Sequence, residues 1–417
     1  MRILFLSSAL RATYPASGRL RPLSLALCIM ALTVTGAVAG PREQAARMHD
    51  RLAGVPASEA VLSAMQLEIE AGNAVAAAYI AMENPAFYNT TLKTWAAPWT
   101  NEAFDKFVPL NDYIATVIGM VRDDVDFRQV LSGDILYVGE NGLGLPAYSN
   151  SNNVHYQAME DQVVDLSEHL VRTAQSSVTG LPAEATAGVM TTRAAARAFF
   201  IDGTNRAMFR FTLINHLCTD LEGVADITRP PDRIRQDVSR SPGGDSRLFH
   251  NNCVSCHSGM DPLAQAFAYY DYDYDADADP DGDFGALAYN RAGQTDPVTG
   301  LRVQEKYWIN SNNFVHGYIT TDDGWDNYWR SGPNYNLGWS DSLPGSGNGA
   351  KSMGEELANS RKFASCQVTK VFKEVCLRSP QDASDRDQIT QMTDDFTAGG
   401  YRIKSVFAQA ASYCKGE

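Results

Sequence analysis

Apolar residues recur at spacings of three and four along both ends of the 417-residue chain, which predicts a mostly α-helical protein. In the N-terminal half, the helical pattern covers residues 43–80 (with a second helix opening at Ser58), 110–122, 183–199 and 205–220. In the C-terminal part, it covers residues 354–360, 362–377, 386–397 and 401–413. We therefore expect helices at both ends of the fold, each burying one apolar face.

The middle of the chain lacks a sustained pattern. Asp261 and Pro262 predict the start of a helix that continues to Tyr269. From there to residue 326 no period persists, so we expect loops with short strands near 307–310 and 316–320.

Proline and glycine residues between positions 229 and 245 break the helical pattern completely. A break of this kind is typical of a domain boundary. We expect a helical domain of residues 40–245 and a second domain of residues 246–417, which carries a loop-rich insertion at 271–350.

The first 39 residues have the composition of an export signal. Four Arg and no acidic residue precede an apolar run at 23–34, and the small residues Ala37 and Ala39 mark a cleavage site before Gly40. The run is too short to span a membrane, and no second long apolar run follows. We expect a periplasmic or secreted protein without a membrane anchor.

Residues 253–257 read Cys-Val-Ser-Cys-His, the attachment signature of a c-type haem. Cys253 and Cys256 would bond the porphyrin, and His257 would bind one face of the iron. A zinc site would require a second cysteine pair or a spaced histidine pair, and a thioredoxin-type redox pair would require alternating strands and helices around it. Neither is present, so we expect one covalent haem c in a cytochrome c-like domain.

The second face of the iron has several candidate ligands. Met260 follows His257 by three residues and lies on the same side of the ring, which argues against it. His316 lies in a loop, and Met353 lies in a glycine-rich stretch just before a predicted helix. Either residue, another ligand or an open position remains consistent with the sequence.

An acidic stretch after Tyr270 contains Asp277, Asp279 and Asp281, followed by Gly282. This matches the first half of a calcium-binding loop, although Ala288 stands where the closing Glu is expected. The alternatives are a bound calcium ion and a solvated acidic loop that docks a basic partner.

Four further cysteines lie beyond the signal and the haem motif: Cys218, Cys366, Cys376 and Cys414. Cys366 and Cys376 fall on one predicted helix, about 15 Å apart along its axis, too far to bond each other. If the last three helices run up, down and up, Cys376 meets Cys414, and Cys218 is left to pair with Cys366. The alternative is that some of these thiols are free and buried.

Several segments together resemble the secreted planctomycete-type cytochromes. They are RLAGVP at 51–56, AGVMT at 187–191, RPPD at 229–232, CVSCHSGMDPL at 253–263, and Leu357, Phe363 and Cys366 followed by Arg378 and Asp387. The resemblance implies export, a haem and helical domains linked to a haem domain. It implies no substrate.

Removal of the four signal arginines changes the net charge from −14 to −18. A surface this acidic repels nucleic acid and attracts a redox partner with a basic docking face. Electron transfer by a periplasmic monohaem cytochrome is the function we expect. The alternatives are a peroxidase-like or substrate-oxidising haem enzyme with an open iron face, and a polymer- or partner-binding module that carries a tethered haem.

Overall fold

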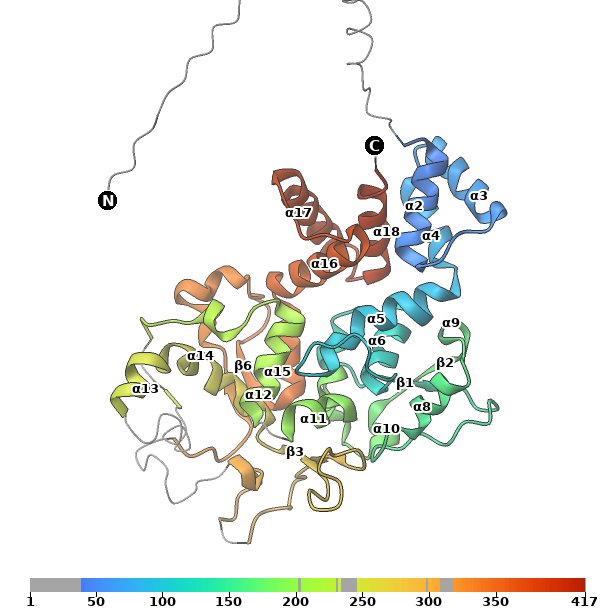
Figure 1. Ribbon diagram of the computed structural model, residues 1–417. Helices are drawn as coiled ribbons and strands as arrows, with labels where there is room; N and C mark the ends of the chain where they lie inside the picture. The colour runs from blue at the N-terminus through green and yellow to red at the C-terminus, as the bar shows by residue number, and fades with distance from the viewer. Residues whose placement is uncertain are drawn as a thin grey trace, which may run out of the picture.

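The computed structural model in Figure 1 describes residues 39–201, 204–229, 232–233, 246–297, 299–307 and 318–416. The expected export signal (apart from Ala39), the predicted domain boundary and His316 lie outside these residues. Helical residues (57%) far outnumber strand residues (7%). The prediction of a mostly α-helical fold is therefore confirmed.

The described residues begin with the helices α2 (Pro41–Ala53), α3 (Glu59–Glu70) and α4 (Ala74–Met82). The predicted helical stretch 43–80 is thus interrupted twice. Gly54 ends α2 in the left-handed conformation, with φ of 70°, where a side chain would be strained. Ser58 begins α3 by accepting a hydrogen bond from the backbone N–H of Val61, so the predicted helix start is confirmed.

The middle of the chain is built from short elements. Those before the haem motif are η1 (Phe87–Leu92), α5 (Lys93–Ala96), η2 (Ala97–Thr100), α6 (Asp112–Arg122), α7 (Gln129–Ser132), β1 (Leu136–Gly139), α8 (Val154–Asp161), α9 (Leu166–His169), β2 (Leu170–Thr173), α10 (Gln175–Thr179), η3 (Ala183–Ala185), η4 (Gly188–Thr191), α11 (Arg193–Phe200), α12 (Asn205–Thr212), η5 (Leu213–Leu217) and η6 (Leu221–Val224). The label η denotes a 3-10 or π turn. Strands β1 and β2 pair antiparallel.

The predicted helix at 183–199 is wrong over its first half, where the chain makes the two 3-10 turns η3 and η4. Gly188 adopts φ of +55°, and a Cβ there would lie 2.2 Å from the carbonyl oxygen of Val130. This close backbone approach requires a non-helical glycine. Helix α11 begins only after Thr192, whose side chain accepts from the N–H of Ala195.

Strands replace part of the expected loop region. β3 (Tyr270–Asp273) pairs antiparallel with β4 (Ala286–Tyr289), and β5 (Gly324–Asp326) pairs with β6 (Ser346–Asn348). The side chains of Tyr270 and Tyr272 are buried, whereas Asp271 and Asp273 face outward. This alternation has the period of a strand, so the expectation of loops here was wrong. The turns η9 (Glu305–Tyr307), η10 (Tyr328–Arg330) and η11 (Gly332–Leu337) complete the region.

The chain ends in four helices: α15 (Gly349–Ala358), α16 (Arg361–Cys376), α17 (Ala383–Ala398) and α18 (Ile403–Tyr413). The last three pack against one another, and α18 also lies against α2 and α4, as the red and blue helices of Figure 1 show. One cluster of buried apolar side chains extends from Ala45 to Ala411. The two predicted domains therefore share a core in the described residues.

Two disulfides link the cysteines as predicted. Cys218 pairs with Cys366 and Cys376 pairs with Cys414, with Cα atoms 5.3 and 5.5 Å apart. The first joins the end of η5 to α16, and the second joins the ends of α16 and α18. Structural disulfides are typical of an oxidising compartment outside the cytoplasm.

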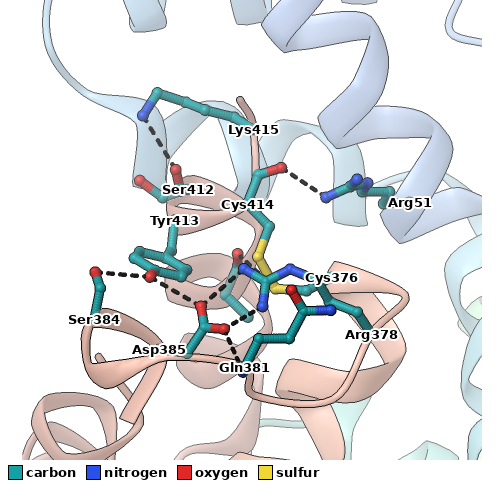
Figure 2. Close-up of a disulfide and its surroundings, with 11 residues drawn as sticks. Arg51, Cys376, Arg378, Gln381, Ser384, Asp385, Ser412, Tyr413, Cys414 and Lys415 are labelled. Atoms are coloured by element: carbon teal, nitrogen blue, oxygen red, sulfur yellow. Dashed lines mark hydrogen bonds and ion pairs between the residues drawn. A yellow bond between two sulfur atoms is a disulfide. The ribbon is translucent and has the colours of Figure 1, made fainter. Parts of the chain in front are cut away.

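A buried carboxylate lies beside the second disulfide (Figure 2). The side chain of Asp385 is only 1% exposed and forms an ion pair with Arg378. Asp385 also accepts hydrogen bonds from the backbone N–H of Gln381, at 2.8 Å, and from the Tyr413 hydroxyl, at 3.0 Å. The Arg378 guanidinium above all holds the pKa of Asp385 well below its ordinary value of 3.8. These contacts tie the loop after α16 to α18.

We expect Asp385→Asn to lower the free energy of unfolding at pH 7 by about 2 kcal/mol, because it removes the charged partner of Arg378. The carboxylate has a lowered pKa in the folded state, so its contribution is present above about pH 4 and declines as the pH falls further. Urea unfolding at pH 7 and pH 3 measures this difference. Asp394→Asn is the matched control, since Asp394 pairs with Arg361 on the surface with both side chains 53% exposed. A loss no larger than that of the control would contradict the assignment.

Candidate functional site

The haem motif lies where two helices meet. α13 (Ser246–Asn252) ends just before Cys253, and α14 (Val254–Ala264) begins directly after it. The N–H groups of Cys256 and His257 both donate to the carbonyl oxygen of Cys253, at 3.3 and 3.2 Å. Positions i, i+3 and i+4 of a helical turn share one face. The turn therefore presents both thiols and the imidazole on the same side of α14.

Both motif cysteines are unpaired. Cys253 and Cys256 are free and half-buried, whereas the other four described cysteines form disulfides. The thiol of Cys256 lies 3.6 Å from the carbonyl oxygen of Leu221, and burial raises its pKa. Neither motif thiol is therefore used in a disulfide among the described residues.

The imidazole of His257 is held by a carboxylate on its own helix. Nδ1 lies 3.0 and 3.1 Å from the two carboxylate oxygens of Asp261, whose side chain is completely buried. A carboxylate accepts only, so Nδ1 carries the proton and donates it to this bond. The ring of Phe249 packs edge-on against the imidazole at 5.5 Å. Among the described residues Nε2 has no hydrogen-bond partner, so this nitrogen could bind a metal ion.

The expected helix start at Asp261 is wrong. Asp261 and Pro262 lie inside α14, and the helix continues to Ala264 before the 3-10 turn η8 (Gln265–Phe267). Asp261 does not cap a helix, because its carboxylate faces back by one turn to His257. The i, i+4 spacing of His257 and Asp261 was visible in the sequence. It was missed because Pro262 suggested a new helix.

The opposite face of α14 packs directly on tryptophan. A Cβ at Gly259 would lie 2.0 Å from Nε1 of Trp329, whose side chain is 1% exposed. Gly259 follows His257 by two residues, about 200° around the helix. Trp339 holds the Trp329 segment in place, since its Nε1 donates to the carbonyl oxygen of Trp329 at 2.9 Å. The motif helix is therefore anchored from the side away from the imidazole.

We expect Gly259→Ala to lower the free energy of unfolding by about 1–2 kcal/mol. Alanine gains about 1 kcal/mol over glycine in a helix, but overpacking against a buried indole costs up to about 3 kcal/mol. Thermal unfolding followed by circular dichroism measures the net effect. Gly40→Ala is the control, because its Cβ would meet only the flexible end of Glu43. A Gly259→Ala variant with a higher free energy of unfolding than the wild type would contradict the close contact between Gly259 and Trp329.

Two of the candidates for a second iron ligand, Met260 and Met353, lie among the described residues. Met353 was expected before a helix but lies inside α15, fully buried. At Gly354 a Cβ would lie 1.8 Å from the carbonyl oxygen of Leu131, so α15 packs tightly on α7. Met260 lies one turn after His257 on α14 and is 3% exposed. His316 lies outside the described residues.

The acidic stretch is held by two arginines of α11. Nε of Arg193 donates to the carbonyl oxygen of Gly285 at 2.8 Å, and Nε of Arg197 donates to that of Asp281 at 2.9 Å. The Asp279 carboxylate accepts from the backbone N–H of Phe284. No three of the His, Cys, Asp or Glu side chains in the described ranges are grouped to hold a metal ion. The calcium site expected at Asp277, Asp279 and Asp281 stays a prediction.

No protein-family model matches the chain, and neither a curated protein nor a solved structure matches it. Within the described ranges, no helix is both long enough and apolar enough to cross a membrane.

Proposed function

We propose that the chain is a monohaem c-type cytochrome that transfers electrons outside the cytoplasm. The observation that carries the proposal is the first turn of α14, with two unpaired thiols and one imidazole on a single face. Its cysteines remain free in a chain whose other described cysteines are all paired. Residues 246–417 form the haem-carrying part in this proposal.

Each motif residue has a distinct role. Cys253 and Cys256 hold the porphyrin by thioether bonds, and Nε2 of His257 binds the iron. Haem c, when bound, supplies a one-electron iron couple. His316 and Met353 are the candidates for the second iron ligand, and Met353 lies fully buried inside α15.

The surface near the motif fits a basic partner. Asp220 and Glu222 lie close enough to Cys256 to raise its pKa, after the larger effect of burial. Asp220 is paired with Arg210 at 2.6 Å, whereas Glu222 is exposed. Ile227, five residues further along the chain, is 88% exposed. An exposed carboxylate and an exposed apolar residue are suited to a redox protein with a basic docking face.

The spectrum of the purified protein tests the proposal. The chain is expressed with and without a haem-attachment system, and the pyridine haemochrome spectrum is recorded. We expect one haem per chain that resists acid–organic extraction, only when the attachment system is present. A colourless protein, or a haem that is fully extracted, would overturn the proposal.

A haem enzyme is the second candidate. It is favoured by the position of Met353, which is fully buried inside α15 instead of lying in a loop before that helix. If His316 does not bind the iron, one iron face is open to a small ligand. Rapid binding of carbon monoxide by the ferrous protein supports this candidate, and a low-spin spectrum unchanged by carbon monoxide supports electron transfer.

A further inference from the structure

We propose that Asp261 is a positioning residue that lowers the reduction potential of the haem through His257. This inference rests on the proposed function, because it requires His257 to bind iron. Asp261 lies four residues after His257, outside the Cys-x-x-Cys-His signature, so the inference gives a role to a residue that the signature does not include. Asp261 acts by holding the proton of Nδ1 and so fixing the direction of Nε2.

The geometry of the pair is favourable for this role. Nδ1 of His257 lies within 3.1 Å of both oxygens of Asp261, and the carboxylate is completely buried while the imidazole is 20% exposed. The ring packs on Phe249, so its orientation is restricted on another side as well. A histidine ligand whose second nitrogen donates to a carboxylate is fixed in one tautomer and is a stronger electron donor.

The charge of Asp261 determines the direction of the effect. The oxidised iron carries one more positive charge than the reduced iron, so a nearby buried negative charge stabilises the oxidised form. An imidazole that donates to a carboxylate strengthens this preference. The haem therefore has a lower potential than one whose histidine donates to a neutral acceptor.

The backbone around the pair supports a fixed arrangement. Gly259, between His257 and Asp261, packs on the buried indole of Trp329, which holds the helix from the other side. Pro262 follows Asp261 and fixes its own φ. Because both partners lie on one anchored helix, the hydrogen bond does not depend on a loop or on another domain.

The experiment compares reduction potentials of the haem-loaded full chain. We expect Asp261→Asn to keep covalent haem and to favour the reduced form by about tenfold, which is about 59 mV for one electron. Asp261→Glu retains the negative charge, so its reduction potential is expected to lie between those of the wild type and Asp261→Asn. Spectroelectrochemical titration measures the potential.

Glu222→Gln is the matched control, since it removes one negative charge beside Cys256 on the exposed turn η6 without touching His257. Its shift is expected to be much smaller, because solvent screens an exposed charge. Asp261→Asn that retains haem but shifts the potential no more than Glu222→Gln would overturn the inference. The proposed function would survive that result, whereas absence of covalent haem from the wild type would remove both.

A measurement on the wild type covers the case in which Asp261→Asn does not fold. In protein labelled with ¹⁵N-histidine, the Nδ1 proton of His257 is expected to exchange slowly, because its acceptor is completely buried. Rapid exchange of this proton, or its absence, would also overturn the inference.

Discussion

Replacing Cys253 and Cys256 together by serine is expected to abolish covalent haem attachment and to leave the helical fold in place. The serine hydroxyl is a far weaker nucleophile than the thiol, so no bond to the porphyrin forms. Neither thiol takes part in a disulfide, so the fold does not depend on them. After acid–organic extraction, the variant should be free of haem and the wild type should retain it, while far-ultraviolet circular dichroism stays the same.

The single variant Cys256→Ser is the control for this experiment. One thioether bond through Cys253 remains, so the haem should stay with the protein and its pyridine haemochrome band should shift. Retention of haem by the double variant would contradict the assigned roles of both cysteines. Equal loss of haem from the wild type would contradict covalent attachment itself.

Removal of the Cys218–Cys366 disulfide is expected to have the largest effect on stability. The bridge closes a loop with a sequence separation of 148, against 38 for Cys376–Cys414. The loss of chain entropy on cross-linking gives about 5 kcal/mol for the longer loop and about 4 kcal/mol for the shorter one. The double variant Cys218→Ala with Cys366→Ala should therefore lose about 5 kcal/mol in guanidinium unfolding.

The double variant Cys376→Ala with Cys414→Ala serves as the comparison, with an expected loss of about 4 kcal/mol. The shorter bridge joins helices that are also held by the buried Asp385, so other contacts remain when it is removed. If removal of the shorter bridge lowered the free energy of unfolding clearly more than removal of the longer one, loop entropy would not be the main source of stabilisation by these disulfides. Both variants are measured without reductant, so that the remaining bridge stays intact.

The C-terminal helices and the disulfides could be predicted from the sequence because short-range spacing decides them. Apolar residues at helical spacing gave α16, α17 and α18 nearly to their ends. The distance along one helix excluded a bond between Cys366 and Cys376. An assumed up, down and up order of the last three helices then favoured the two pairs that the structure contains.

Strand β3 and the full extent of helix α14 were not predicted, because in each segment one sequence pattern pointed to a different structure. The Tyr270 to Asp273 segment was interpreted by its acidic residues, although its tyrosines alternate inward as in a strand. Pro262 suggested a helix start, although α14 tolerates a proline near its end. Contacts with distant residues decide both structures. The Tyr270 to Asp273 segment pairs with β4, and α14 packs on Trp329.

The candidate site was predictable in part. The spacing of Cys253, Cys256 and His257 predicted a haem-attachment turn, and their common face follows from helix geometry alone. The support from Trp329 could not be predicted, since the indole comes from a segment without periodicity and meets Gly259 only in the folded chain. The position of Met353 likewise depends on how α15 packs against α7.

The contact of α18 with α2 and α4 has a consequence for the timing of folding. Helix α18 lies against α2 and α4, and Arg51 donates to the carbonyl oxygen of Cys414 at 2.6 Å. A chain that emerges N-terminus first cannot complete this contact until its last residues arrive, and contacts so distant in sequence form slowly. Cys253 and Cys256 emerge before Cys366, Cys376 and Cys414. The turn at residues 253–257 is therefore exposed for an interval before the core closes, as the proposed haem attachment requires.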